Sequence, residues 1–315
     1  MKIHDRMQAE EKGECYLIKV IATDLDGTLC DVDHDINAHT ARVIAKAQKA
    51  GIRIIIATGR FYEGTMNTVR GVLEQVDLLL NSGAEVINAQ GETIIHRPLS
   101  PESVRMIYEA MKGEEPVVAK YNGFERNGYI GTRKELEEKA LQDFLVFHDH
   151  QTKEEACQDR RFLNMLTNCK AYSNIDTLLE EVGEVAKIFC FGGSIEQIAA
   201  TREKLKKLPH LGIASSFPTN IEITHEQAQK GPALKAYIES LGYSMDEVMV
   251  FGDSDNDLSM MEMDFVTVAM GNAEDNIKRV SKYVTKPNDQ DGVAWAIEQL
   301  LERQGSIQNQ SQLEN

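Results

Sequence analysis

Two aspartates follow the first apolar run of the chain at a spacing that suits nucleophilic or acid–base chemistry. Asp24 and Asp26 come directly after the run 18–22, whose continuous apolar character predicts a buried strand. Because ligands of an open α/β sheet lie outside the carboxyl ends of its strands, we expect both carboxylates to face a crevice and Leu25 to turn away. One carboxylate could act as a nucleophile while the other acts as a general acid or base. A strand end followed by an Asp-Gly turn is the simpler interpretation of this segment alone.

A hydroxyl and a glycine end the next apolar run, 54–57, and could bind an anion. Thr58 supplies a hydroxyl, Gly59 permits close backbone approach, and the helix expected to follow presents unpaired N–H groups. An ordinary strand-to-helix turn is the alternative. Arg60 either reaches the same anion or lies in solvent on the helix surface.

A lysine and a group of acids complete the candidate residues. Lys230 precedes a Gly-Pro pair and an apolar-periodic stretch, so it is expected at a helix start, either solvated or binding a phosphoryl group. Three carboxylates and an amide follow the apolar run 248–251, namely Asp253, Asp255, Asn256 and Asp257. Clustered carboxylates repel one another unless a cation lies among them, and oxygen ligands favour Mg2+ over a soft transition metal. A solvated acidic loop is the alternative.

Together the four segments resemble the motifs of the haloacid dehalogenase-like hydrolases, and more closely those of the Cof-type (IIB) branch of magnesium-dependent phosphatases. The resemblance covers about 19–301 and includes the further segments 81–84, 268–273 and 288–294. In the first of these, a serine at 82 interrupts the Asn-Gly-Ala stretch of the branch. The N-terminal extension, the C-terminal tail and a long inserted segment fall outside the resemblance.

The resemblance implies a chemical role for each matched residue. Asp24 would attack phosphorus to form an aspartyl phosphate, and Asp26 would protonate the leaving group and then deprotonate a water molecule. Thr58 and Lys230 would help to neutralise the phosphoryl charge.

The resemblance also implies the ligands of phosphate and metal. The phosphate would be bound by Leu25, Thr58, Gly59, Lys230 and Asn256, the first and third through backbone groups. Mg2+ would be held by Asp24, the backbone carbonyl of Asp26, and Asp253, with Asp257 either a direct ligand or a neighbour of the metal or Lys230.

Composition narrows the possible partners. The 315 residues are 42% hydrophobic, enough to bury a sizeable core, and the net charge of −16 argues against nucleic acid and anionic membranes. Apolar runs are far shorter than the roughly 20 residues of a membrane helix, and the first 17 residues are too polar for a secretory signal. We therefore expect a small phosphorylated metabolite as the partner and the cytoplasm as the compartment.

The five cysteines favour neither a zinc site nor a disulfide framework, because none are spaced as Cys-x-x-Cys. Cys30 follows the first motif and is the one thiol to weigh as a nucleophile. No activating base stands near it in the sequence, so a small buried hydrophobic side chain is the favoured interpretation.

Alternating elements predict an α/β fold with a Rossmann-like parallel sheet core. The strands are expected at 18–24, 52–57, 77–81 and 248–252, and the helices at 38–50, 61–74 and 231–241. A disordered tail, 304–315, should follow, because the chain there is rich in Gln, Ser and Asn.

An inserted α/β domain is expected at 97–216, between core segments 18–96 and 217–303 and after a polar extension, 1–17. Its helices are predicted at 101–112, 134–142, 174–181 and 195–207, and its strands at 117–121, 129–132 and 185–191. The first two strands should form a hairpin around Asn127-Gly128. In the resembling branch this position holds a substrate-specifying cap, and the segment 121–126 either faces the substrate or is an exposed hairpin loop.

The predicted function is a cytoplasmic phosphatase for a sugar phosphate or phosphorylated cofactor. A phosphomutase would use the same motifs but return the phosphoryl group to the sugar. A non-catalytic phosphate-responsive module is a further alternative, against which the intact Asp24, Asp26, Lys230 and Asp253 argue.

Overall fold

The computed structural model describes residues 17–32, 34–147, 152–159, 162–163, 166 and 169–313. The extension expected over 1–17 lies outside the described residues, except for Leu17. The chain divides into two compact units: a core unit that ends at His96 and resumes at Gln229, and an insert unit, Arg97–Ala228.

The core unit contains, in the part of the chain that is described, an eight-stranded sheet in the order β14-β13-β12-β1-β2-β3-β4-β5. The strands are β1 (Val20–Thr23), β2 (Arg53–Ala57), β3 (Asp77–Leu80), β4 (Glu85–Ile87), β5 (Thr93–His96), β12 (Val248–Gly252), β13 (Val266–Ala269) and β14 (Tyr283–Val284). Pairing from β14 to β3 is parallel, whereas β4 and β5 add an antiparallel edge. The predicted parallel α/β core is therefore confirmed.

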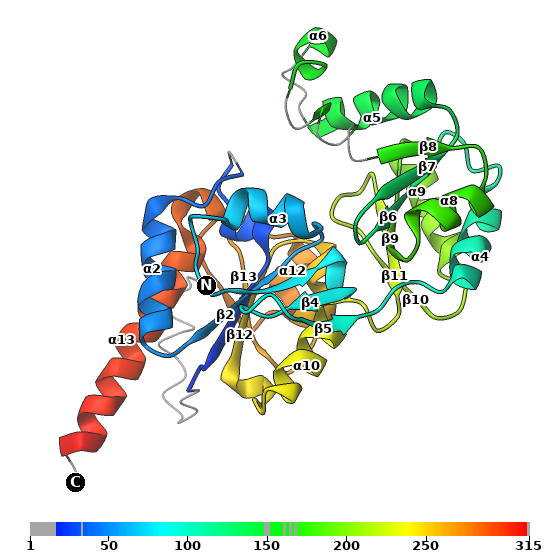
Figure 1. The fold of residues 1–315 in the computed structure, drawn as a ribbon. Coiled ribbons are helices and arrows are strands. Elements are labelled where there is room, and N and C mark those ends of the chain that lie inside the picture. The colour runs from blue at the N-terminus through cyan, green and yellow to red at the C-terminus, as the bar shows by residue number, and fades with distance from the viewer. Residues whose placement is uncertain are drawn as a thin grey trace. The chain divides into compact units, whose positions relative to one another are not determined.

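Helices cover both faces of this sheet (Figure 1). They are α2 (Ala38–Lys49), α3 (Tyr62–Val69), α10 (Lys230–Ser240), α11 (Leu258–Met261), α12 (Asp275–Val280) and α13 (Gly292–Leu313). Asn37 starts α2 by accepting hydrogen bonds from the N–H groups of His39 and Thr40. Helix α13, near the C-terminus, packs against α2, which follows β1. The two ends of the core unit's sequence are therefore in contact.

The tail expected to be disordered from 304 is helical through Leu313, so that prediction is wrong for the described residues. The segment continues a helix whose first turns are packed in the core, and extending an existing helix costs much less than starting one. Glutamine, the commonest residue of this segment, is also compatible with helix.

The insert unit is a second α/β domain with its own hydrophobic core. Its strands follow the order β10-β11-β9-β6-β7-β8 among the described residues, and they are β6 (Val118–Gly123), β7 (Asn127–Ile130), β8 (Cys169–Tyr172), β9 (Val185–Phe191), β10 (Leu211–Ala214) and β11 (Ile221–His225). Its helices are α4 (Pro101–Met111), α5 (Arg133–Phe147), α6 (Lys153–Ala156), α8 (Ile175–Val182) and α9 (Ile195–Leu205). Apolar residues of α4, α8 and α9 share one cluster with the sheet, and those of α5 form another.

The insert extends to Ala228 rather than to 216. The reason is that β11 pairs antiparallel with β9 and β10, which places the segment after 216 in the insert's sheet. No turn signal in the sequence marks this strand as belonging to one unit rather than the other.

The turn of the predicted hairpin is also placed wrongly. Asn122 pairs with Asn127, so the connection is 124–126 and the Asn127-Gly128 pair lies within β7. Gly128 is required there for close packing, because a Cβ would stand 2.9 Å from Leu178 and 3.0 Å from both Tyr172 and Val182.

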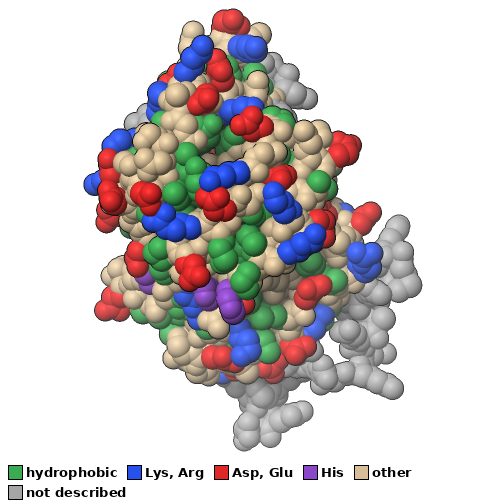
Figure 2. Space-filling view, turned by 90° about the vertical axis from the view of Figure 1, so that its right-hand side faces the viewer, with side chains coloured by type: hydrophobic (Ala, Val, Ile, Leu, Met, Phe, Trp, Pro, Cys, Tyr) green, Lys and Arg blue, Asp and Glu red, His purple; other side chains and the backbone are tan. Residues whose placement is uncertain are grey.

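Charged side chains of both signs are interspersed over the face shown in Figure 2 rather than gathered into a basic stripe. Of the helices in the described ranges, none combines the length and apolarity needed to cross a membrane.

Candidate active site

The carboxyl end of β1 delivers Asp24 into a buried position. Its backbone N–H donates to the carbonyl of Phe251 in β12 at 3.1 Å, and its side chain is 4% exposed. The following loop, Leu25–Leu29, turns sharply at Gly27, whose φ is 76°. A Cβ at Gly27 would stand 2.6 Å from Oδ2 of Asp253, so glycine is needed both for the backbone conformation and for the approach of that carboxylate. Leu25 is buried, as expected of a side chain turned away from the crevice.

Lys230 lies fully buried between two carboxylates. Its Nζ donates to Oδ1 of Asp24 at 2.6 Å and to Oδ1 of Asp257 at 2.7 Å. Burial alone would lower the pKa of Lys230, but the charges of Asp24 and Asp257 outweigh it and raise the pKa above its ordinary value. The ammonium group therefore stays charged and fixes the orientation of Asp24.

Asp253 and Asp257 are held by the loop that follows β12. Oδ2 of Asp257 accepts from the backbone N–H groups of Asp253 at 2.9 Å and Ser254 at 3.2 Å, while Oδ1 of Asp253 accepts from the hydroxyl of Thr28 at 2.7 Å. Burial and the neighbouring charge of Asp257 raise the pKa of Asp253 to about 7. The loop thus presents carboxylates that repel one another.

The acidic residues fit a hard divalent cation. Asp24, Asp253 and Asp257 each offer a carboxylate oxygen within 4.8 Å of the other two. Three carboxylates surround one lysine, which leaves excess negative charge in a buried space, and all donors are oxygens of the kind that Mg2+ prefers. Both oxygens of Asp257 already accept hydrogen bonds, so Asp24 and Asp253 are the better ligands.

Asp26 points its carboxylate to a different set of partners. Arg60 donates from Nε to Oδ2 at 2.8 Å and from Nη2 to Oδ1, and Nδ1 of His34 lies 3.3 Å from Oδ1. Burial would raise the pKa of Asp26, but the hydrogen bonds with His34 and Arg60 outweigh it and hold the pKa well below its ordinary value. Arg60 is therefore not a solvated surface residue; it binds the carboxylate of Asp26.

The expected anion loop lies at the end of β2, the strand next to β1. Thr58 is buried, and its Oγ1 accepts from the N–H of Arg60 at 3.1 Å, which leaves the hydroxyl hydrogen to donate elsewhere. Asn256 lies after β12, where its Oδ1 accepts from Ser254 Oγ at 3.1 Å. The candidate phosphate ligands other than Lys230, which begins α10, thus follow three adjacent strands, β12, β1 and β2.

Several residues that brace the site were not singled out from the sequence. Nδ2 of Asn272 donates to the carbonyl of Gly27 at 2.8 Å, its Oδ1 accepts from the N–H of Asn288 at 2.9 Å, and Nδ2 of Asn288 donates to the carbonyl of Cys30 at 2.9 Å. These asparagines belong to the segments 268–273 and 288–294. The resemblance of these segments to the family was the only feature of the sequence that could have pointed to them. Thr28 had no comparable signal beyond its place in the first motif.

The thiol of Cys30 is not a nucleophile. It is buried, and burial followed by the charge of Asp26 raises its pKa to about 12. The thiolate is therefore negligible near neutral pH, and the interpretation of Cys30 as a small buried hydrophobic residue holds.

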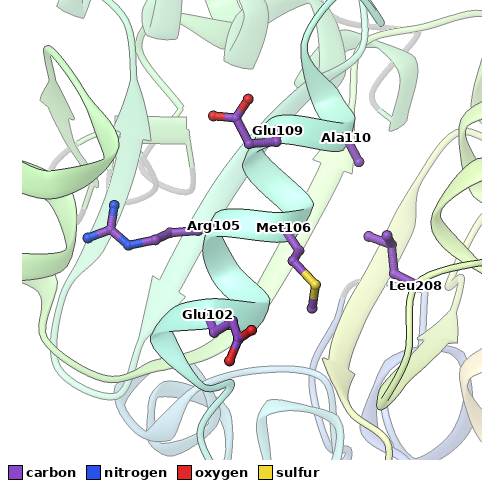
Figure 3. Close-up of a pocket in the computed structure, with 6 residues that line it drawn as sticks. All are labelled: Glu102, Arg105, Met106, Glu109, Ala110 and Leu208. Carbon is purple, nitrogen blue, oxygen red and sulfur yellow. The ribbon is translucent and has the colours of Figure 1, made fainter.

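A surface hollow of about 590 Å3 lies in the insert unit, lined by α4 residues and Leu208. Figure 3 shows Met106 and Ala110 on the side of α4 toward Leu208, with Arg105 pointing away. Its lining is mainly apolar, and Arg105 pairs with Asp176 at 2.5 Å. The hollow therefore offers little to a phosphate group.

Comparison with known proteins agrees with this geometry. A family model of haloacid dehalogenase-like hydrolases matches residues 21–297. The 5-amino-6-(5-phospho-D-ribitylamino)uracil phosphatase YwtE of Bacillus subtilis (strain 168) is 28% identical over 303 residues, which cover 91% of this chain and 99% of the relative.

Solved structures share the fold across both units. A haloacid dehalogenase-like hydrolase from B. subtilis aligns with a TM-score of 0.78 at 25% identity, covering 89% of this chain and 99% of that chain. The subclass IIB sugar phosphatase BT4131 aligns with a TM-score of 0.68 at 23% identity, covering 89% and 98%. The chain belongs to the haloacid dehalogenase-like hydrolases, in their Cof-type branch of phosphatases.

Proposed function

We propose that this chain is a Mg2+-dependent phosphatase that hydrolyses a small phosphorylated metabolite through an aspartyl phosphate on Asp24. The observation that carries the proposal is the buried Lys230 bridging Asp24 and Asp257 beside Asp253. A buried lysine shared by two carboxylates is costly to desolvate and is a weak source of stability. Its arrangement suits the binding of an anionic group next to a nucleophile.

The first half-reaction breaks the ester bond. Asp24, oriented by Lys230, attacks phosphorus, and the P–O bond to the leaving group breaks as the new bond forms. The leaving alkoxide takes a proton from Asp26. The phosphoryl oxygens are bound by Thr58, Lys230, Asn256 and the backbone N–H groups of Leu25 and Gly59.

The second half-reaction regenerates the enzyme. Asp26, now ionised, takes a proton from a water molecule that attacks the aspartyl phosphate, and inorganic phosphate leaves as Asp24 regains its carboxylate. Mg2+ would be held by Asp24, the backbone carbonyl of Asp26, and Asp253, beside Asp257, and when bound it neutralises charge on the phosphoryl oxygens.

Asp26 has to change partners during this cycle. Arg60 and His34 favour its ionised form, which suits the water-activating step but not the protonation of a leaving group. An incoming phosphoryl group competes with Asp26 for Arg60 because both are anionic. Loosening of this ion pair would allow Asp26 to take up the proton that it later donates.

The relatives support a small metabolite as the substrate. YwtE is named for a phosphorylated ribitylaminouracil and BT4131 for sugar phosphates, and both substrates join a phosphate ester to a polyhydroxylated chain. A phosphomutase remains the second candidate, because it would use the same nucleophile. Release of inorganic phosphate, rather than an isomeric sugar phosphate, distinguishes the two.

A panel of phosphorylated metabolites, assayed with and without Mg2+, tests the proposal. Chelation should abolish phosphate release, Mg2+ should restore it, and Ca2+ should restore little because it prefers longer bonds and more ligands. Asp24→Asn should lower turnover by several powers of ten, whereas Asp246→Asn, at an exposed position outside the site, should not. Full activity in excess chelator, or a tenth of normal activity in Asp24→Asn, would refute the mechanism.

A further inference from the structure

The turn after β3 has an unusual backbone. Asn81, Ser82 and Gly83 take φ angles of 50°, 60° and 111° in succession, and the first two are not glycines. Residues other than glycine rarely adopt this left-handed backbone conformation. Consecutive residues keep it only where the surrounding structure requires it. The turn corresponds to the segment 81–84, whose role the proposed mechanism leaves open.

The side chain of Asn81 is equally unusual. It is 1% exposed, yet neither its Oδ1 nor its Nδ2 has a hydrogen-bond partner among the described residues. Buried carboxamides are nearly always paired, because leaving the donor and acceptor unpaired costs their full desolvation. A partner from outside the chain is therefore expected.

The turn and the end of β3 before it hold the proposed phosphate-binding loop through three backbone hydrogen bonds, two of them from the turn itself. The N–H of Thr58 donates to the carbonyl of Leu79 at 2.8 Å, the N–H of Ser82 to the carbonyl of Thr58 at 3.0 Å, and the N–H of Asn81 to the carbonyl of Arg60 at 2.9 Å. The left-handed residues thus direct successive N–H groups at the carbonyl groups of the loop. The hydroxyl of Thr58, which accepts from the N–H of Arg60, keeps its hydrogen to donate to an anion.

The same turn contacts the helix that carries the lysine. The 81–83 segment packs against α10, whose first residue is Lys230. The turn is therefore adjacent to two of the elements that supply proposed phosphate ligands, and all of these residues belong to the core unit.

We propose that Asn81 is a further residue of the phosphate-binding site, with its Nδ2 donating to an oxygen of the bound phosphate. This inference rests on the proposed function. The anion supplies the acceptor that the buried amide lacks, and a hydroxyl hydrogen of monoprotonated phosphate or of its hydrating water satisfies Oδ1. The strained turn places the amide beside the loop before the ligand arrives.

Inhibition by inorganic phosphate, measured on the Mg2+-loaded full-length protein, tests the proposal. Asn81→Gly removes the amide but accepts the left-handed φ, so the thermal midpoint of the ligand-free protein should stay the same or rise. Its inhibition constant for phosphate should increase about ten- to a hundredfold, as expected for the loss of one hydrogen bond to a charged group. Asn81→Asp should weaken phosphate binding more than Asn81→Gly, because a carboxylate repels the anion.

Gln75→Gly is the matched control. Gln75 also has a φ of 50° but is exposed, so glycine relieves the same strain without touching the site, and phosphate inhibition should not change. Unchanged inhibition in Asn81→Gly overturns the inference, as does a fall in its thermal midpoint without an effect on phosphate. Failure of the unsubstituted protein to release or bind phosphate would instead overturn the proposed function, and this inference with it.

Discussion

At the scale of single residues, Lys230 is a buried cation that balances the charge of two carboxylates. It is fully buried and is the shared partner of Asp24 and Asp257. Burial raises the pKa of Asp24 well above its ordinary value and the neighbouring acids Asp257 and Asp253 raise it further, whereas the charge of Lys230 lowers it. Lys230 therefore supplies a charge that these buried carboxylates need in the folded protein, besides its proposed role in phosphate binding.

We expect Lys230→Met to destabilise the protein strongly. The substitution approximately keeps the volume but leaves two buried carboxylates without their shared cation, which costs about 3–5 kcal/mol. Lys235→Met is the control on the same helix, because Lys235 forms a partly exposed i,i+4 pair with Glu239 and should cost less than about 1 kcal/mol. Urea unfolding in the presence of chelator measures both. Equal unfolding midpoints for the two variants would contradict the ionised bridge described for Lys230.

Arg60 offers a second prediction at this scale. Arg60→Met removes both donors that position Asp26. The carboxyl then takes up a proton more easily, but it is no longer fixed beside the leaving group, so hydrolysis of alkyl phosphates, whose leaving groups need a proton, should fall about ten- to a hundredfold. Activated aryl phosphates should be affected much less. Arg70→Met, which removes an exposed partner of Glu63, is the control and should change neither rate. Equal losses on both substrates would place Arg60 on the phosphate group rather than on Asp26.

The acidic residues and Lys230 could be recognised from the sequence because each directly follows an apolar strand or precedes a helix. Their partners could not. The bond from Thr28 to Asp253 spans 225 positions, and no local pattern predicts which hydroxyl meets which carboxylate. The pairing of Arg60 with Asp26 was equally inaccessible, because a flexible side chain near a helix start has several possible partners.

At the scale of elements, the loop after β1 is held by hydrogen bonds from two segments that are distant in the sequence. The segments 268–273 and 288–294 both reach it through Asn272 and Asn288, and each follows a strand of the parallel sheet or its edge. Because the backbone carbonyl of Asp26 and the close approach of Gly27 to Asp253 depend on the shape of this loop, its bracing should control the metal site.

We expect Asn272→Ala to weaken Mg2+ binding. The variant loses the donor to Gly27 and the acceptor for Asn288, and loss of such supporting contacts typically costs about tenfold or more in metal affinity. The Mg2+ concentration that gives half-maximal activity should rise accordingly. Asn174→Ala is the control: it removes the N-cap of α8 in the insert and should cost about 1 kcal/mol of stability without changing the Mg2+ requirement. An unchanged Mg2+ requirement in Asn272→Ala would show that the loop keeps its shape without the brace.

Most strands that form continuous apolar runs were predicted, although the fully buried β13 was missed. Strands β1, β2, β3 and β12 are continuous apolar runs, and β9 in the insert was also located by its pattern. The short strands β4, β5 and β14 went unrecognised, because two to four residues carry too little periodicity to detect. The Asn127-Gly128 pair was misplaced because packing against Tyr172 and Leu178, rather than a turn, requires its glycine.

At the scale of the whole molecule, the insert is joined to the core at two neighbouring points of the chain's path. The first connection follows β5, which ends at His96, and the second ends just before Lys230. Nη1 of Arg97 donates to the carbonyl of Gln227 at 2.6 Å, which ties the two connections together. The start of the insert is therefore tied to the segment that leads into α10, the helix that begins at Lys230.

The last prediction is that the insert determines which metabolite is hydrolysed. Asn122 lies on β6 opposite Lys187 of β9, and its buried Oδ1 has no partner in the described part of the chain, so it is available to a polar group of a substrate. Asn122→Ala should change the ranking of metabolites by kcat/KM while leaving a small aryl phosphate within about tenfold, or about 1.4 kcal/mol in barrier. Arg126→Ala tests the exposed connection 124–126 in the same way, and Glu154→Ala, on the surface of α6, is the control for both.

Exchange of the whole insert is the more decisive experiment. Contacts to the non-reacting part of a substrate can be used to assist the transfer of its phosphoryl group, so replacing Arg97–Ala228 by the corresponding unit of a relative with another preference should transfer that preference. The Mg2+ requirement and the hydrolysis of a small aryl phosphate should remain those of the core, since Asp24, Lys230 and Asp253 all lie outside the exchanged unit. A folded, Mg2+-dependent chimera that kept the original ranking of substrates would locate specificity in the core and contradict this assignment of the insert.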